Sequence, residues 1–142
     1  MQTNLDITPA EWQIMRVVWS LQETTSSEII EVLQRKVDWK PATIKTLLRR
    51  LVDKEALGAK KQGRAFLYYP LVAEQATMDG AADGLFNNIC ERHVGTTLQH
   101  VIEQANLSQA DIKSLQALLA HKAMTAPQEV ACNCVPGKKM EC

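Results

Sequence analysis

A glycine hairpin signal follows three helix-start signals in this chain, and that order restricts the fold more than any other feature of the sequence. The Gln62-Gly63 pair separates a basic arm at 59–61 from an arm at 64–70 that is rich in aromatic and β-favouring residues. A glycine-containing pair between two such arms predicts a two-stranded antiparallel hairpin. The fold must therefore place a short, positively charged hairpin beside a group of helices.

Each of the three helices before the hairpin has its own start signal. Thr8 is followed by Glu11, and Thr25 by Glu28, which is the spacing at which a capping hydroxyl and a glutamate hydrogen-bond reciprocally around a helix N-terminus. Pro41 suits the first position of a third helix, because the N–H that proline lacks has no partner there. Apolar residues recur at helical spacing after each signal, so each helix is expected to bury one face.

Three helices followed by a basic hairpin is the order of a winged helix, a variant of the helix-turn-helix. We expect the third helix to end at Gly58. The winged-helix DNA-binding domain, mainly α with a two-stranded wing, is then expected to occupy residues 1–71.

The second half of the chain is helical by the same criteria. Its apolar periodicity predicts helices at 72–83 and 85–104, and Ser108 caps a last helix. About fifty residues of amphipathic helix make too small a core to be stable alone. Residues 72–124 are therefore expected to form a helical dimerisation region with a second copy of the chain, and residues 125–142 a flexible linker and cysteine-rich tail.

The formal net charge is zero, but the charges are unevenly distributed. Between Arg35 and Arg64 there are ten Lys or Arg residues and three Asp or Glu residues, a balance of +7, and the rest of the chain carries −7. A basic block of this length on an otherwise acidic chain predicts a polyanionic partner.

The exposed face of the third helix and the hairpin are predicted to contact double-stranded DNA. Small side chains near the helix N-terminus would let the helix approach base edges, and threonine methyl groups could contact thymine. The basic side chains would reach guanine or phosphates. The candidate DNA-binding residues are Lys40, Ala42, Thr43, Lys45, Thr46, Arg49, Arg50, Lys60, Lys61 and Arg64. Taken one at a time, each is equally compatible with an ordinary solvated surface.

Three of the four cysteines, Cys132, Cys134 and Cys142, lie within eleven residues of one another. Cys132 and Cys134 point to the same side of an extended segment, and a turn at 135–138 with Pro and Gly at its centre would return Cys142 toward them. Clustered thiolates bind soft ions such as Zn(II) or Cu(I), and Met140 could add a thioether ligand to Cu(I) alone. An unstructured end with incidental cysteines is the alternative interpretation.

The remaining features restrict the setting and the class of protein. No apolar run reaches the roughly 20 residues that a membrane helix needs. The polar N-terminus lacks a secretory signal, so we expect a cytoplasmic protein with reduced thiols. No Ser-His-Asp set, HExxH motif or glycine-rich phosphate loop occurs in the sequence, so an enzyme is not expected. Cys90 is expected on an apolar helix as a small core residue, and His93, His100 and His121 as surface or cap residues.

The run Leu5–Met15 and the hairpin Lys60–Arg64 resemble the penicillinase-repressor family of winged-helix regulators, and the resemblance covers residues 5–123. Within that family, the segment Cys132-Asn133-Cys134-Val135-Pro136-Gly137 is similar to the CopY group of copper-responsive repressors of copper-export operons. The resemblance implies a homodimer on a pseudo-palindromic operator of copper-homeostasis genes. It also implies that the dimer binds DNA while the tail holds zinc and is released when Cu(I) displaces the zinc. A copper chaperone is a further candidate partner.

The tail departs from the CopY pattern, which has a second Cys-x-Cys at this point. Met140 stands where a thiolate is expected, so the three tail thiolates form a good Cu(I) site and an incomplete zinc site. The fourth zinc ligand stays open among water, Glu141, a histidine, the carboxylate of Cys142 and the other subunit.

Two other functions are compatible with the sequence. A repressor of this family could instead be inactivated by proteolysis, as its β-lactam-responsive members are, or by thiol oxidation. A cytosolic copper-binding or copper-delivery protein is the second alternative. The basic block argues against it, because metal storage requires no such surface.

Overall fold

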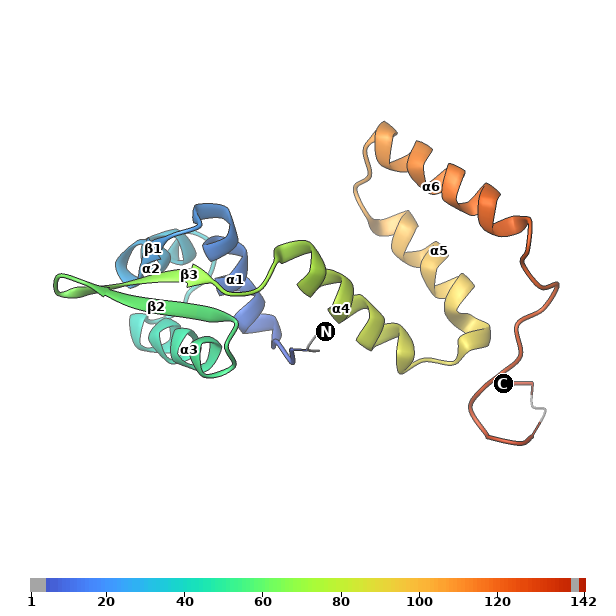
Figure 1. The fold of residues 1–142 in the computed structure, drawn as a ribbon, viewed down its shortest axis with the longest axis horizontal. Coiled ribbons are helices and arrows are strands. Elements are labelled where there is room, and N and C mark those ends of the chain that lie inside the picture. The colour runs from blue at the N-terminus through green and yellow to red at the C-terminus, as the bar shows by residue number, and fades with distance from the viewer. Residues whose placement is uncertain (1–4, 139–140) are drawn as a thin grey trace. The chain divides into compact units, whose positions relative to one another are not determined.

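The computed structural model describes residues 5–138 and 141–142, and the chain divides into two compact units between Ala82 and Asp83. The N-terminal unit contains α1 (Pro9–Leu21), β1 (Thr24–Thr25), α2 (Ser26–Gln34), α3 (Pro41–Asp53), β2 (Leu57–Gln62) and β3 (Ala65–Pro70), as Figure 1 shows. The chain continues through α4 (Glu74–Asn87), the 3₁₀ helix η1 (Glu91–His93), α5 (Val94–Gln104) and α6 (Gln109–Ala123). The predicted mainly helical fold with a winged helix is confirmed.

The first two helices begin where the capping signals predict. Thr8 accepts a hydrogen bond from the backbone N–H of Glu11 at 3.2 Å, and the Glu11 carboxylate accepts one from the backbone N–H of Thr8 at 3.1 Å. Thr25 and Glu28 form the same reciprocal pair at the start of α2. Each box satisfies two N–H groups that would otherwise lack partners, which fixes where the helix starts.

The third helix begins at Pro41, as predicted, but the prediction that it ends at Gly58 is wrong. α3 ends at Asp53, because Glu55 adopts a φ of 62° and redirects the chain into β2. Gly58 lies inside β2 instead, where the ring of Tyr69 on the neighbouring strand leaves no room for a Cβ atom. The glycine therefore serves close packing within the sheet and not helix termination.

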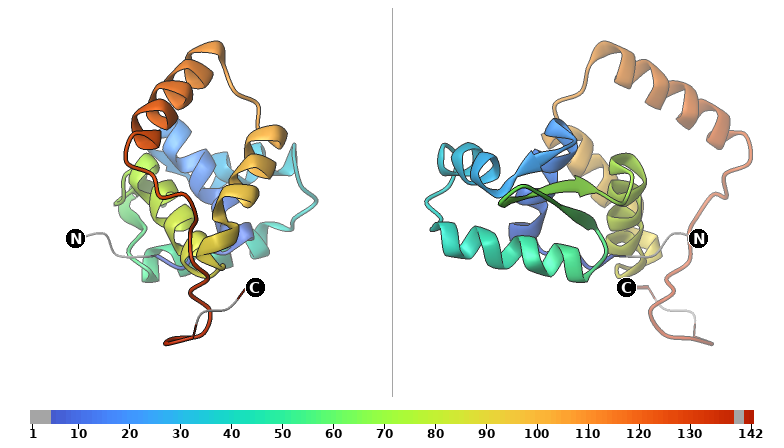
Figure 2. Two further views of the ribbon diagram at one scale, coloured as in Figure 1. Left: turned by 90° about the vertical axis from the view of Figure 1, so that its right-hand side faces the viewer. Right: turned by 60° about the vertical axis from the view of Figure 1, so that its left-hand side comes forward.

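The wing belongs to an antiparallel sheet with the strand order β1-β3-β2, one strand more than the two-stranded hairpin that the sequence predicts. Pairing of Gln62 with Ala65 makes Gly63 and Arg64 the two turn residues, and Gly63 has a φ of 64°. Glycine at the first position is a favoured arrangement of a two-residue hairpin loop. The added strand β1 pairs with β3 through Thr24 and Thr25. All three helices contact this sheet (Figure 2).

Among the described residues, the hydrophobic core lies within the N-terminal unit. Its buried apolar side chains come from the segment before α1, from α1, α2 and α3, and from the turn after α3 and the first residue of β2. They are Ile7, Ile14, Met15, Val17, Val18, Trp19, Ile29, Leu33, Ile44, Leu47, Leu48, Leu51, Ala56 and Leu57. Trp19 packs at 5.8 Å from the ring of Trp12 and donates its indole N–H to the carbonyl of Val72 at 3.0 Å. This bond attaches the segment after the wing to α1.

One carboxylate is buried in this core. Glu11 is 0% exposed, and Lys54 Nζ lies 2.7 Å from its Oε1. Burial raises the pKa of Glu11, but the hydrogen bonds from Lys54 and Thr8 outweigh burial, so the pKa lies below its usual value. The residue therefore caps α1 and also joins α1 to the end of α3.

The helices of the second half differ from the predicted 72–83 and 85–104. α4 continues through Gly84 to Asn87, and the break falls at 88–90, before η1. The adjacent Asn87 and Asn88 account for this position, because asparagine side chains compete with the helix for backbone hydrogen bonds. α6 is capped as predicted, since Ser108 and Asp111 form a reciprocal box.

The second half has no core of its own among the described residues. No residue of α4, η1, α5 or α6 is buried. Large apolar side chains remain 42–60% exposed along these helices, at Leu85, Leu98, Val101, Ile102, Ile112, Leu118 and Leu119. Within the described part of the chain, no helix combines the length and the apolar character required to cross a membrane.

Candidate functional site

The first candidate site is the outer surface of α3. Ile44, Leu47, Leu48 and Leu51 bury one face of the helix in the core. This leaves the opposite face to solvent, and all the predicted DNA-binding residues of this segment are exposed: Lys40, Ala42, Thr43, Lys45, Thr46, Arg49 and Arg50. The Thr46 hydroxyl donates to the carbonyl of Ala42 at 3.0 Å. The predicted thymine contact therefore depends on the methyl group of Thr46.

The wing supplies the second part of this surface. Lys60, Lys61 and Arg64 are all exposed, and Arg64 lies in the turn itself. Lys60 is paired within its own chain: its Nζ lies 2.8 Å from Glu23 Oε1 and 5.6 Å from the centroid of the Tyr69 ring. The hydrogen bond to Glu23 raises the pKa of Lys60 above its usual value. Exposed pairs of this kind contribute little to stability, so Lys60 can exchange Glu23 for a phosphate at small cost.

The second candidate site is the cysteine tail. The predicted turn is present, since the N–H of Lys138 donates to the carbonyl of Val135 at 3.3 Å and Gly137 has a φ of 76°. As predicted, the turn brings Cys142 back to the Cys132-x-Cys134 pair. Met140, the predicted thioether ligand, lies outside the described residues.

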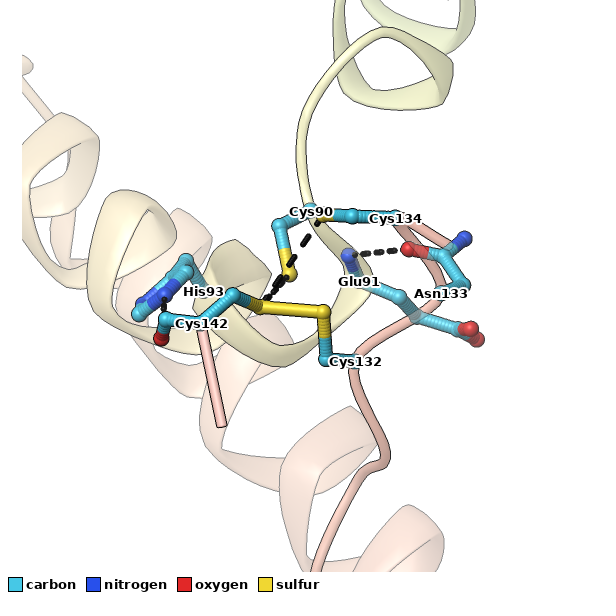
Figure 3. Close-up of a disulfide and its surroundings, with 7 residues drawn as sticks. All are labelled: Cys90, Glu91, His93, Cys132, Asn133, Cys134 and Cys142. Carbon is cyan, nitrogen blue, oxygen red and sulfur yellow. Dashed lines mark hydrogen bonds between the residues drawn. A yellow bond between two sulfur atoms is a disulfide. The ribbon is translucent and has the colours of Figure 1, made fainter. Parts of the chain in front are cut away.

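The three tail sulfurs lie beside a fourth, that of Cys90, which the sequence analysis does not predict at this site. The Sγ atoms of Cys90, Cys132, Cys134 and Cys142 all lie within 4.8 Å of one another. Cys90 Sγ is 2.9 Å from Cys142 Sγ, and Cys134 Sγ is 3.9 Å from it. Cys132 and Cys142 are joined by a disulfide, which Figure 3 shows beside the other two sulfurs.

The spacing of the sulfurs fits one soft metal ion. Tetrahedral zinc with Zn–S bonds of about 2.3 Å separates its sulfur ligands by roughly 3.8 Å. The 3.9 Å between Cys134 and Cys142 matches this value, and the remaining sulfurs require shifts of about 1 Å. The thiolate is the form of cysteine that binds a metal ion, and a disulfide contains none. The disulfide between Cys132 and Cys142 must therefore be reduced before these four residues bind an ion.

Cys90 is not the core residue that the sequence predicts. It follows the end of α4, in the break before η1, and it is only half-buried. The prediction fails because it extends a helix through Asn87 and Asn88, and a cysteine on a continuous apolar helix would face the core. One signal in the sequence could have located it, since Cys90 is the one cysteine outside the tail of a chain whose tail lacks a fourth thiolate.

The two free thiols differ in acidity. Burial raises the pKa of Cys90, but the backbone N–H groups of Arg92 and Asn133 and the thiol of Cys134 lower it more, so it lies below its usual value. The hydrogen bond to Cys90 raises the pKa of Cys134, and burial and the charge on Cys90 add to this effect. Cys90 is therefore the first of the two to become a thiolate. His93, His100 and His121 are exposed, as predicted.

The sequence of this chain is similar to those of known proteins. A family model described as penicillinase repressor matches residues 7–121. An uncharacterized 16.5 kDa protein in the ptsI 3′ region of Latilactobacillus sakei is 48% identical over 133 residues, which cover 94% of this chain and 91% of the relative. The methicillin resistance regulatory protein MecI of Staphylococcus aureus is 32% identical over 117 residues, which cover 82% of this chain and 95% of MecI.

Among solved structures, monomeric BlaI of Bacillus licheniformis, in complex with the blaP half-operator, is 37% identical with a TM-score of 0.48. The match covers 54% of this chain and 93% of that one.

The family assignment rests on the length of these sequence matches. The family model covers most of the chain, and the 32% identity to MecI extends across both units. Members of this family are regulators without catalytic activity, which confirms the prediction that the chain is not an enzyme. The chain belongs to the penicillinase repressor family and is a DNA-binding transcriptional repressor.

Proposed function

We propose that this repressor controls copper-homeostasis genes. It binds a pseudo-palindromic operator as a homodimer while its cysteine cluster holds Zn(II), and it leaves the operator when the cluster binds Cu(I). It acts in the cytoplasm, where the operator lies and thiols stay reduced. The single observation that carries the proposal is a cluster of four sulfur atoms within 4.8 Å in a member of a DNA-binding repressor family.

The charge and exposure of the N-terminal unit support the DNA half of the proposal. The ten candidate contacts on α3 and the wing are all exposed. Seven of them are basic, and six of these have no ion-pair partner among the described residues: Lys40, Lys45, Arg49, Arg50, Lys61 and Arg64. Free cations of this kind displace the counterions of DNA, which favours binding to any duplex. Small side chains at Ala42 and Thr43 leave room for base edges near the start of α3.

The exposed apolar side chains of the second half support the homodimer. Leu98, Val101 and Ile102 on α5 are 42–46% exposed, and Leu118 and Leu119 on α6 are 59% and 56% exposed. Apolar surface of this extent is normally covered by a partner. A second copy of the chain covers it with the same residues on both sides, and its two-fold symmetry matches a pseudo-palindromic operator.

The chemistry of the tail supports copper as the signal. Thiolates are soft ligands that suit both Zn(II) and Cu(I), and Cu(I) accepts fewer ligands than the four that structural zinc takes. Cys132, Cys134 and Cys142 can therefore satisfy Cu(I) by themselves once they are reduced. An exchange from zinc to copper would change how many residues the ion holds together.

The test is an operator-binding titration with reduced protein in the apo, zinc-loaded and Cu(I)-loaded states. We expect the zinc form to bind more tightly than the Cu(I) form by roughly 5- to 150-fold, which is the range of typical allosteric couplings. A Cys132→Ser/Cys134→Ser variant is the matched control and is expected to bind equally in all three states. Equal operator affinity of the native protein in the zinc and Cu(I) states would contradict the proposal.

Thiol oxidation is a second candidate signal, and the disulfide between Cys132 and Cys142 is the observation that favours it. In that case oxidation by diamide would release the repressor from the operator, and Cu(I) added under reducing conditions would not. The same titration with diamide in place of the metals separates the two signals.

A further inference from the structure

Cys90 lies at a junction in the chain and not within a helix. It follows the end of α4 at Asn87 and immediately precedes η1, and its Sγ is 2.9 Å from Cys142 Sγ. Its half-buried side chain faces the three sulfur atoms of the tail, as Figure 3 shows. This environment differs from the apolar surroundings that a cysteine acting as a small hydrophobe would have.

Two further contacts join the tail to the same junction without using sulfur. The backbone N–H of Glu91 donates to the side-chain oxygen of Asn133 at 3.0 Å. The Nε2 atom of His93 lies 2.8 Å from the backbone oxygen of Cys142. Asn133 stands between Cys132 and Cys134, so its contact with Glu91 positions both neighbouring thiols beside Cys90 (Figure 3).

These contacts also decide between the other candidates for a fourth ligand. His93 already directs its Nε2 atom at a backbone oxygen, so that nitrogen is occupied. The Cys90 sulfur is within 4.8 Å of all three tail sulfurs. Its other partners are backbone N–H groups, which can also donate to a thiolate that binds a metal ion. A ligand from another subunit is therefore not needed to complete a four-thiolate set.

We propose that Cys90 is the fourth zinc ligand and that it comes from the same chain as the tail. This inference rests on the proposed function, because it assigns a ligand to that same metal site. With Cys90 included, the site offers the four thiolates that structural zinc takes. Zinc binding then closes a loop between positions 52 residues apart, with η1, α5 and α6 inside it.

The two metals differ in their need for Cys90. Zinc requires the fourth thiolate, whereas Cu(I) is satisfied by the three thiolates of the tail. Replacement of zinc by Cu(I) therefore frees the junction at Cys90 while the tail still holds an ion. Since α4 leads into this junction from the N-terminal unit, the release acts on the segment that connects the DNA-binding elements to the rest of the chain.

The test compares metal binding by the full-length reduced protein with that of Cys90→Ser and of Asn88→Ser, a matched control in the same break. Co(II) serves as a spectroscopic probe for zinc, because thiolate-to-cobalt charge-transfer absorption increases with the number of Co–S bonds. We expect the charge-transfer absorption of Co(II)-loaded Cys90→Ser to be weaker than that of the native protein by the contribution of one Co–S bond. Its zinc affinity should fall by more than the roughly 10- to 100-fold that follows loss of an outer-shell partner, while its Cu(I) affinity stays close to native.

Asn88→Ser should match the native protein in all three measurements, and circular dichroism checks that both variants fold. If Cys90→Ser retains the native cobalt spectrum and zinc affinity, the inference is wrong while the proposed function stands. If the native protein binds none of the three ions, the proposed function itself fails.

A mixing experiment tests whether Cys90 and the tail belong to one chain. Cys90→Ser protein is refolded together with a Cys132→Ser/Cys134→Ser/Cys142→Ser variant and loaded with Co(II). Ligands from a single chain predict no four-thiolate spectrum in the mixture. Recovery of that spectrum would show that the ligands come from different chains and would overturn this part of the inference.

Discussion

The N-terminal and C-terminal units contain helices of similar length but bury very different amounts of apolar surface. In the first unit every member of the hydrophobic cluster lies between Ile7 and Leu57, and most are less than 2% exposed. In the second, no helical residue is buried and the large apolar side chains stay 42–60% exposed. The first unit thus has the core of an independent domain, whereas the helices of the second leave their large apolar side chains exposed within a single chain.

This difference shows how the chain separates its tasks. A rigid core holds α3 and the wing in a fixed arrangement, which precise contact with DNA requires. A segment without a core has few internal contacts to lose, so the metal ion or second copy of the chain that we propose would change its arrangement at modest cost in free energy.

The largest expected effect comes from a cavity in the core of the first unit. Leu48 is 1% exposed, and Leu48→Ala should lower the free energy of unfolding by about 2–5 kcal/mol. The loss should not depend on protein concentration, because the site lies within one chain. Urea denaturation at several concentrations measures it, and a loss below about 1 kcal/mol would contradict the description of this core.

A smaller effect is expected in the second unit, and it should depend on concentration. Leu118 is 59% exposed, so Leu118→Ala should leave the unfolding of the first unit unchanged and weaken the dimerisation that we propose by up to about 1.5–3 kcal/mol. Sedimentation equilibrium measures the dimer dissociation constant, with Gln116→Ala on the same helix as the control. An unchanged constant would exclude Leu118 from the dimer interface.

The cations of the first unit, and not those of the second, are expected to contact DNA. Lys61→Ala/Arg64→Ala should weaken operator binding and reduce the slope of log affinity against log salt by about 0.9 for each lost phosphate contact. Lys113→Ala/Lys122→Ala on α6 removes the same number of cations from the second unit and should leave the slope unchanged. Equal slopes for the two double variants would exclude the wing from the contact surface.

The smallest expected effect is a pH dependence confined to the first unit. The pKa of Glu11 in the folded chain lies below the usual value of 4.5, so its contribution to stability is present above that value. This contribution is lost as the pH falls from 4.5 through the folded pKa. Unfolding measured against pH should show the loss for the native protein and not for Glu11→Gln, and identical profiles would assign the acid sensitivity to other groups.

The elements that the sequence predicts correctly have signals within a few residues of one another. The capping boxes at Thr8 and Thr25 fix the starts of α1 and α2, and Pro41 fixes that of α3, because each signal satisfies or removes an N–H in the first helical turn. The turn at 135–138 is also predictable from neighbouring residues, because Pro and Gly at its centre set the backbone angles directly.

The features that the sequence does not predict depend on contacts between distant residues. β1 has two residues, too few for any periodic pattern, and it exists because Thr24 pairs with Tyr68. The approach of Cys90 to Cys142 spans 52 residues. The predictions for Gly58 and for the second-half helices failed at a local level, because a glycine and an asparagine pair each permit more than one local structure.

The indole of Trp19 connects the packing of α1 to the direction in which the chain leaves the wing. Its N–H is bonded to the carbonyl of Val72, and its ring lies beside that of Trp12. Tryptophan fluorescence responds to the loss of such a bond, so any displacement of the exit segment should shift the emission of the unlabelled protein. If operator binding or the proposed exchange of metal ions moves this segment, the intrinsic fluorescence of the protein will report the movement without an added label.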